Sequence, residues 1–205
     1  MKNTIVTITG PTCSGKSTLA RFLSQRGNIP EVRSFTTRPK RRGEVDEEHY
    51  DFLTKEQVQA IPQNELIEIV SFNGNYYGNT HAQMKEALAE GEGVATVVVE
   101  PGGVWHWQKA AKQFGFNHFA LYLEQRPETL IKRFAERLKS VHPDNVASEI
   151  NRLENMVSVE QPTWGKAFKY DLTVRDLGAS LAYTEVTAEM LLGFLTLSFS
   201  RASSV

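Results

Sequence analysis

The sequence lacks the features that mark several large classes of protein. It has one cysteine, Cys13, in 205 residues, so no disulfide can form within the chain. Its apolar runs are shorter than the roughly 18 residues of a membrane-spanning helix, and no signal-peptide core follows Met1. It also has no internal repeat and no low-complexity linker. We therefore expect an intracellular, cytoplasmic protein with no membrane partner.

An excess of charge of one sign is also missing. The chain has 23 Lys and Arg against 24 Asp and Glu, for a formal net charge of −1. Proteins that hold nucleic acid through its phosphate backbone need a basic surface, which an even balance of charge does not provide overall. We expect no nucleic-acid partner. A monomer and a homodimer both fit the sequence.

The most specific pattern in the chain is GPTCSGKST, at residues 10–18. It lies between the apolar run Ile5–Thr9 and a helical pattern, so we expect it to connect a strand to a helix. It matches the phosphate-loop pattern GxxxxGKS, in which backbone N–H groups and the helix N-terminus point at phosphate oxygens. The residues expected to bind ATP are Gly10, Pro11, Thr12, Cys13, Ser14, Gly15, Lys16, Ser17 and Thr18.

Three side chains of this loop have distinct expected roles. Lys16 would reach the β- and γ-phosphates of ATP, and the hydroxyl of Ser17 would be a ligand of a Mg²⁺ cofactor. Cys13 is a free thiol beside them. We interpret it as a small residue that fits the loop, with a reactive, oxidisable thiol as the alternative.

Apolar runs typical of strands alternate with helical patterns along the chain, which indicates an α/β fold. Together with the phosphate loop, this predicts a P-loop NTPase with a five-stranded parallel sheet flanked by helices. The expected strands are Ile5–Thr9, Val32–Thr36, Val94–Glu100, Phe119–Leu123 and Tyr170–Val174. The expected helices are Ser17–Arg26, Thr54–Ile61, His81–Glu90, Trp105–Phe114, Pro127–Leu138, Ala147–Val159 and Tyr183–Leu197.

Two stretches interrupt this alternation. Residues 34–80 contain short strand patterns and a hairpin signal at Phe72–Tyr76, so we expect a small β-rich insertion that binds the acceptor of a phosphoryl group. Residues 126–152 are rich in arginine, and we expect them to form a helical lid that excludes water. The P-loop core would then comprise residues 1–33 and 81–205, within a domain of about residues 3–197.

A basic cluster at residues 38–42 lies inside the insertion. Guanidinium groups bind phosphate through paired hydrogen bonds, so Arg38 and Arg41 are suited to hold a phosphate group. Ser34 and Tyr50 can add hydroxyl donors. Taken alone, such a cluster is more often a solvated run of charge, and the acidic residues 44–48 that follow it disfavour nucleic acid as its ligand.

Residues 34–52 resemble the signature of the guanylate kinase family: a serine before Thr-Thr-Arg, then Gly-Glu and His-Tyr-x-Phe. The sequence LIE at 66–68, followed by FNGNYYGNT at 72–80, resembles the next block of that family. The resemblance implies that the phosphate of an acceptor nucleotide is held by Ser34, Arg38, Arg41, Tyr50 and Tyr77. It also implies that Glu68 reads the edge of guanine, since a carboxylate accepts from the N1–H and N2–H donors that adenine lacks.

The rest of the base pocket departs from the family pattern. Asn79 stands where the family usually has a hydroxyl residue, and its amide can donate to guanine O6, with Thr80 as an alternative donor. Glu100 retains the second of two acidic positions at the end of a strand, whereas Val98 replaces the first. Glu100 would hold Mg²⁺ through water or contact the acceptor base, and both interpretations stay open.

Arginines of the expected lid complete the site. Arg133 and Arg137 are four residues apart and so share a helix face, and Arg152 lies in a segment that resembles the second lid motif of the family. Arginines that arrive with a lid would neutralise charge on the γ-phosphoryl group, and surface ion pairs are the alternative. The expected catalytic residues are Lys16, Arg38, Arg133, Arg137 and Arg152.

The sequence thus predicts an ATP-dependent nucleoside monophosphate kinase that phosphorylates GMP or dGMP by Mg²⁺-assisted in-line transfer. Three alternatives remain. The acceptor could be another (deoxy)nucleoside monophosphate with a different or modified base, or ribose 1,5-bisphosphate. The third alternative, a non-catalytic guanylate-kinase-like interaction domain, is disfavoured because Gly15, Lys16 and Ser17 are retained.

Overall fold

The structure is a computed structural model of the chain. It describes residues 2–40, 44–46, 50–72, 74–139, 141–143, 146–175 and 181–200. The expected acceptor residue Arg41 lies outside these ranges.

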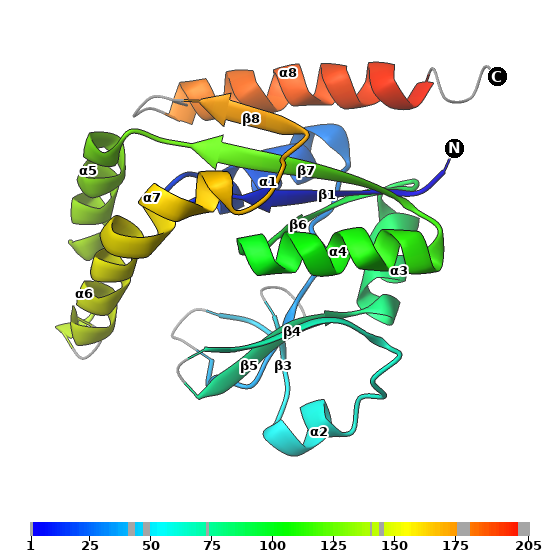
Figure 1. The fold of residues 1–205 in the computed structure, drawn as a ribbon, viewed down its shortest axis with the longest axis horizontal. Coiled ribbons are helices and arrows are strands. Elements are labelled where there is room, and N and C mark those ends of the chain that lie inside the picture. Colours follow the sequence, from blue (N-terminus) through cyan, green and yellow to red (C-terminus); the bar gives the residue numbers. More distant parts are fainter. Residues whose placement is uncertain are drawn as a thin grey trace.

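The core is a parallel sheet with the strand order β6-β1-β7-β8 (Figure 1). Its central strand β1 is buried at every position, because neighbouring strands cover both edges and helices cover both faces. The phosphate loop therefore leaves the sheet from a fully buried strand. The strands are β1 (Thr4–Thr9), β6 (Val94–Val98), β7 (Asn117–Glu124) and β8 (Leu172–Arg175).

The fifth expected strand, Val32–Thr36, is divided between two sheets. At the edge of the core sheet there is a single parallel bridge between Glu31 and Thr96, where Val32 N donates to Thr96 O at 2.7 Å. Pro30 precedes this bridge and has no N–H, so it cannot extend the ladder backwards. The chain then leaves the core, and Phe35–Thr36 forms β2 of a second sheet. The described residues thus give the core sheet four strands and a bridge at its edge.

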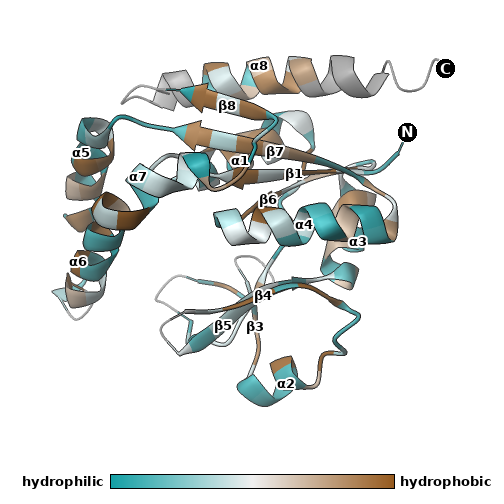
Figure 2. Ribbon diagram, in the orientation of Figure 1, coloured by the Kyte–Doolittle hydropathy of each residue, from teal (hydrophilic) through white to brown (hydrophobic). Residues whose placement is uncertain are grey.

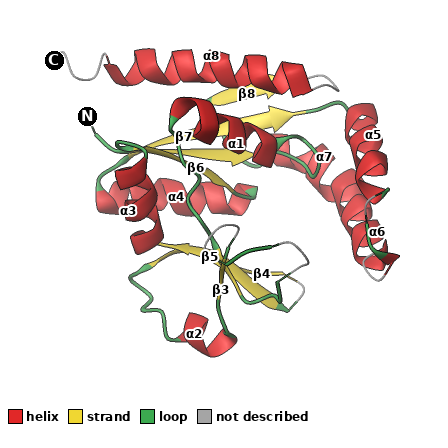
Figure 3. Ribbon diagram, turned by 180° about the vertical axis from the view of Figure 1, so that it is seen from behind, coloured by secondary structure: helices red, strands yellow, loops and turns green. Residues whose placement is uncertain are grey.

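Helices cover both faces of the core sheet (Figures 1 and 3). Alternation along β1 points Val6 and Ile8 at one face, where they pack in a cluster with Leu19 and Leu23 of α1. Ile5 points at the other face and packs in the cluster that contains Trp107 of α4. Figure 2 shows the apolar strands between these layers. One face carries α1 (Lys16–Gly27) and α8 (Leu181–Ser200), and the other carries α3 (His81–Glu90) and α4 (Pro101–Phe114).

Two helices, α4 and α8, extend two or more residues beyond an expected end. α4 begins at Pro101 rather than Trp105, because proline is favourable in the first turn of a helix even when glycines follow it. α8 spans 20 residues and packs on α1. Within the described part of the chain, no helix has the length and apolarity to cross a membrane.

The second sheet lies below the core sheet in Figure 1 and has the order β3-β2-β5-β4. Its longest strands form the antiparallel hairpin that the sequence predicted, with Phe72 paired to Asn75. The short helix α2 (Lys55–Gln59) follows β3 and begins with a capping box from Thr54. The strands are β2 (Phe35–Thr36), β3 (Asp51–Phe52), β4 (Leu66–Phe72) and β5 (Asn75–Thr80).

Two helices, α5 (Pro127–Leu138) and α6 (Val146–Asn155), stand side by side at one end of the molecule (Figure 1). They share a small cluster of Leu130, Phe134 and Met156, which is separate from the clusters of the core sheet. The expected helix Ala147–Val159 is α-helical only to Asn155. It continues as a π-helical turn (Met156–Glu160), then as the short α7 (Gln161–Thr163) and a 3₁₀ turn (Trp164–Lys166).

Candidate active site

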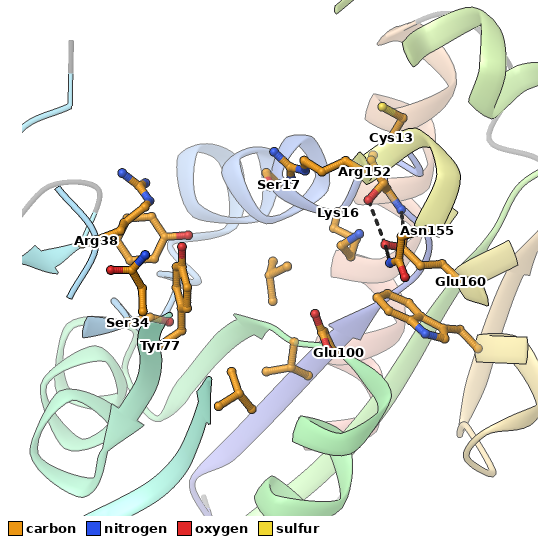
Figure 4. A pocket seen from close by; sticks show the side chains of 18 of the residues that line it. Cys13, Lys16, Ser17, Ser34, Arg38, Tyr77, Glu100, Arg152, Asn155 and Glu160 are labelled. Atoms are coloured by element: carbon orange, nitrogen blue, oxygen red, sulfur yellow. Dashed lines mark hydrogen bonds between the residues drawn. The ribbon is translucent and has the colours of Figure 1, made fainter. Parts of the chain in front are cut away.

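A cavity of about 970 Å³ lies between the core sheet, the second sheet and the α5–α6 pair. Figure 4 shows Lys16 and Ser17 on one side of it and Ser34, Arg38 and Tyr77 on the other. The lining residues come from segments that are far apart in sequence. Expected site residues on its wall are Thr12, Cys13, Gly15, Lys16, Ser17, Thr18, Ser34, Arg38, Tyr50, Glu68, Tyr77, Asn79, Glu100, Arg133, Arg137 and Arg152.

The phosphate loop connects β1 to α1, as its sequence predicted. Gly15 has a φ of 102°, a value that favours glycine. Cys13 has a φ of 64°, which is uncommon for a residue other than glycine. Ser14 N donates to Pro11 O at 3.0 Å and so closes the loop. Lys16 Nζ donates to Gly10 O at 2.5 Å and to Pro11 O at 2.9 Å. The lysine therefore braces the loop and lies inside the cavity.

Opposing effects set the pKa of Lys16. Desolvation lowers the pKa of Lys16 to about 8, although the nearby carboxylate of Glu160 raises it. Cys13 and Glu100 also raise this pKa, and Arg152 lowers it. An ammonium group in such a place is suited to bind phosphate, since a bound anion restores its charge.

Desolvation raises the pKa of the Cys13 thiol, and this outweighs the opposing effect of Arg137 and Lys16. The thiol form is therefore favoured at neutral pH, and thiols react more slowly than thiolates. This environment fits the interpretation of Cys13 as a small residue in the loop.

The three expected lid arginines all reach the cavity, but they have different partners. Arg133 Nη1 donates to Cys13 O and Ser14 O at 3.1 Å each, so α5 holds the outer side of the phosphate loop. Arg137 Nη2 and Arg152 Nη1 each donate to Glu149 Oε1 at 3.1 Å. Glu149, 5% exposed, keeps two arginines from adjacent helices side by side. One carboxylate thus preorganises both guanidinium groups.

On the opposite wall, Arg38 makes a bidentate ion pair with Glu44, with both N–O distances 2.6 Å. Its guanidinium lies 5.2 Å from the ring centroid of Tyr50 and 5.5 Å from that of Phe52. Tyr77 lies edge-on to Tyr50, with ring centroids 6.4 Å apart. The tyrosines and Arg38 therefore form one cluster of cationic and hydroxyl donors, as the sequence predicted, and Glu44 fixes the arginine.

Ser34 and Asn79 form a pair beside this cluster, in which Asn79 Nδ2 donates to Ser34 Oγ at 3.0 Å. Thr80 is not among the residues that line the cavity. Its hydroxyl accepts from Gln83 N at 3.2 Å and begins α3 with a capping box. Asn79 and Thr80 were the two candidate donors to guanine O6. Of the two, only Asn79 lines the cavity.

Glu68 lies between the two sheets and is 7% exposed. Burial raises the pKa of Glu68 to about 7, with a smaller raising effect from Glu100 and a lowering effect from the Trp107 indole. A side chain on Gly103 would be crowded, because its Cβ atom would lie 2.4 Å from Glu68 Oε1 and 2.8 Å from Val99 Cβ, which is attached directly to the backbone. Only the packing of α4 on β4 reveals this role of Gly103.

Glu100 immediately precedes α4 and lines the cavity near the phosphate loop (Figure 4). Desolvation and the carboxylate of Glu160 raise the pKa of Glu100, and Lys16 lowers it. Ser17 and Glu100 both line this cavity, and each has an oxygen atom that can be a metal ligand. Among the residues that the structure describes, no three His, Cys, Asp or Glu side chains gather as a metal cage.

Glu149, Asn155 and Glu160 were not predicted as site residues. Glu149 joins two lid arginines, whereas Asn155 and Glu160 line the cavity. The spacing of Glu149 and Arg152, three apart on a helix, favours an ion pair between them. The position of Glu160 had no such signal, since it depends on the π-helical turn.

Comparison with known proteins gives a consistent result. The family model described as "Guanylate kinase" matches residues 1–181. The guanylate kinase of Symbiobacterium thermophilum is 30% identical over 186 residues, which cover 88% of this chain and 82% of that protein. The guanylate kinase of Clostridium perfringens is 30% identical over 185 residues, covering 78% of this chain and 85% of that protein.

A solved structure supports the fold alone. The crystal structure of guanylate kinase from Anaplasma phagocytophilum has a TM-score of 0.62 and 18% sequence identity, and the match covers 96% of this chain and 86% of that chain. The α/β fold with a P-loop core is thereby confirmed. From the family match and the two relatives, this chain belongs to the guanylate kinase family.

Proposed function

We propose that this protein transfers the γ-phosphoryl group of ATP to GMP or dGMP, giving ADP and the nucleoside diphosphate. The observation that carries this proposal is a single cavity that has the phosphate loop at one end and the side chains of Arg38 and Glu68 at the other. Such a cavity can hold two nucleotides with their phosphates facing each other. The family and the names of its relatives agree with this activity.

At the donor end, the loop N–H groups and Lys16 would bind the β- and γ-phosphates of ATP. Arg137 and Arg152, held by Glu149, are placed to approach the transferring group from the lid. Arg133 contributes through the loop, because it donates to Cys13 O and Ser14 O. We therefore assign direct charge stabilisation to Lys16, Arg137 and Arg152, and a bracing role to Arg133.

A Mg²⁺ ion fits the donor set of this site. Oxygen ligands are what Mg²⁺ prefers, and it commonly uses one or two protein groups with substrate phosphates and water. Ser17 would hold the ion directly and Glu100 through water. Bound there, Mg²⁺ would neutralise charge on the β- and γ-phosphates.

At the acceptor end, Arg38, Tyr50 and Tyr77 would bind the acceptor phosphate together with Ser34. Arg41 is assigned to the same group by its sequence motif. Glu68 and Asn79 would read guanine, the carboxylate accepting from N1–H and N2–H and the amide donating to O6. Arg38 is paired with Glu44 at 2.6 Å, so its guanidinium is already oriented before an acceptor binds.

The parts of the chain divide the work in the same way. We assign acceptor binding to residues 34–80, closure to residues 126–152, and donor binding to the core of residues 1–33 and 81–205. Transfer would be in line, from the γ-phosphorus to an acceptor phosphate oxygen, with no protein nucleophile. The enclosing walls would keep water from competing as the acceptor.

A coupled assay of ADP formation tests the function. The acceptors are GMP, dGMP, dTMP, dCMP, AMP and ribose 1,5-bisphosphate, each with ATP and Mg²⁺. We expect turnover with the guanine nucleotides and at least roughly 100-fold lower kcat/KM with the others. Adenine, thymine and cytosine lack the paired N1–H and N2–H donors for the Glu68 carboxylate, and ribose 1,5-bisphosphate has no base. Inactivity with both guanine nucleotides would contradict the proposal, and MgATP binding without any transfer would favour an interaction domain.

A further inference from the structure

Glu160 ends the π-helical turn that follows α6, and its carboxylate lines the cavity. The residue is 6% exposed. It accepts hydrogen bonds from Thr12 N at 2.5 Å, from Thr12 Oγ1 at 3.2 Å and from Asn155 Nδ2 at 2.8 Å (Figure 4). A carboxylate from beyond the second lid helix is therefore bound to the first turn of the phosphate loop.

The π-helical turn makes this contact possible. In a regular α-helix, residues five apart such as Asn155 and Glu160 would be separated by about 140° around the axis. In a π-helix the backbone bonds join residues five apart, which then lie nearly above one another. The Asn155 amide can thus support the carboxylate that holds Thr12. Single π turns are rare and occur frequently at functional sites.

The loop is held at three successive places. Lys16 donates to the carbonyls of Gly10 and Pro11, and Arg133 donates to those of Cys13 and Ser14. Glu160 holds Thr12, which lies between these segments. Burial of a carboxylate is costly unless hydrogen bonds and an opposite charge offset it. Here the offset comes from groups that belong to the phosphate-binding machinery.

We propose that Glu160 is a positioning residue for phosphoryl transfer: it fixes the loop backbone at Thr12 and lies beside Lys16, so that both are set before MgATP binds. The inference rests on the proposed function, because it concerns the same donor site. It adds a link between the lid and the phosphate loop that uses neither the loop motif nor the lid arginines.

The test compares Glu160→Gln with Glu154→Gln, a matched control that removes an exposed carboxylate from α6. MgATP affinity is measured by calorimetry without any acceptor, and kcat and KM for GMP are measured in the coupled assay. We expect Glu160→Gln to weaken MgATP binding on the order of 10-fold and to leave KM for GMP unchanged, because only the donor loop loses its charged hydrogen-bond partner. Glu154→Gln should match the wild type in both measurements.

Glu160→Asp keeps the carboxylate but shortens the side chain, so it separates the effect of charge from the effect of length. It is also the second test variant if Glu160→Gln does not fold. It should also bind MgATP more weakly than the wild type, since the shorter side chain keeps the charge but loses Thr12. Unchanged MgATP affinity in Glu160→Gln would overturn the inference. So would tighter binding, which would mean that the carboxylate competes with phosphate for the Thr12 N–H. A wild type that binds MgATP more tightly than Glu160→Gln but phosphorylates no guanine nucleotide would contradict the proposed function and leave the role of Glu160 supported.

Discussion

The buried carboxylate of Glu68 illustrates how a single residue can serve binding at the expense of stability. Its pKa is raised by burial to about 7, against an ordinary value of 4.5. The folded protein therefore binds more protons than the unfolded chain between these pH values, and stability falls as pH rises through that window. The full cost, roughly 3 kcal/mol, is present above pH 7. A guanine base would provide the two donors that this carboxylate can accept.

We predict that Glu68→Gln stabilises the fold at pH 8 by up to about 3 kcal/mol and has little effect at pH 4, where Glu68 is protonated. Urea unfolding at the two pH values measures this difference. The same variant should raise KM for GMP on the order of 100-fold, because an amide N–H₂ faces the donors of guanine. Glu90→Gln, which alters an exposed residue of α3, is the control. Equal stability of variant and wild type at pH 8 would contradict the prediction.

At the scale of residues, the sequence motifs predicted the site residues but not the residues that these contact. Glycine and lysine spacing predicted the phosphate loop, and the structure forms it between β1 and α1. The ion pair of Arg38 with Glu44 joins residues only six apart, yet the sequence does not indicate that the two groups lie 2.6 Å from each other. The contact of Gly103 with Glu68 depends on two distant elements, so no pattern in the sequence indicates it.

At the scale of elements, the α5–α6 pair has its own small core. Leu130, Phe134 and Met156 are each 1% exposed and are separate from the clusters that hold the core sheet. Arg133 and Glu160 still join this segment to the phosphate loop. A segment whose apolar core is separate can open locally at a lower free energy than global unfolding, as closure over a substrate requires.

Phe134→Ala should therefore loosen the lid without unfolding the core. We expect faster amide exchange in residues 127–160, equivalent to about 3 kcal/mol, and unchanged protection in β1 and β7. Ile131→Ala is the control, because Ile131 is on the same helix and 50% exposed. Hydrogen exchange followed by mass spectrometry distinguishes the two variants. An equal loss of protection in β1 would show that the lid and the core unfold together.

Most elements followed their local patterns, and the exceptions have tertiary causes. α3 and α5 have the bounds that their periodicity and their first-turn residues predicted. The run Val32–Thr36 reads as one strand, but the chain passes from one sheet to another within it. The helical pattern through Val159 conceals a π turn, since a segment of five residues has too few apolar positions to reveal the change of period.

At the scale of the whole molecule, several elements together form the site. The cavity is bounded by the core sheet, the second sheet and the lid, so no single element forms the proposed donor or acceptor site. A ligand that carries both nucleotides loses translational freedom only once on binding, whereas two separate nucleotides lose it twice.

We predict that adenosine and guanosine joined 5′ to 5′ by a chain of five phosphates will bind at least about 100-fold more tightly than ATP. Calorimetry measures the affinity, and diadenosine pentaphosphate is the matched control because its second base lacks the donors for Glu68. Equal affinity of the mixed dinucleotide and ATP would mean that the two ends of the cavity cannot be occupied together.

The sequence by itself determined the phosphate loop, the α/β class and the acceptor motif, because each depends on spacing over a few residues and on the chemistry of single side chains. The tertiary structure decided which charges meet. It alone brought Arg137 to Glu149 on the next helix and Glu160 to Thr12, 148 residues away. Contacts of that kind depend on how helices pack and where a π turn falls, and no local pattern encodes either.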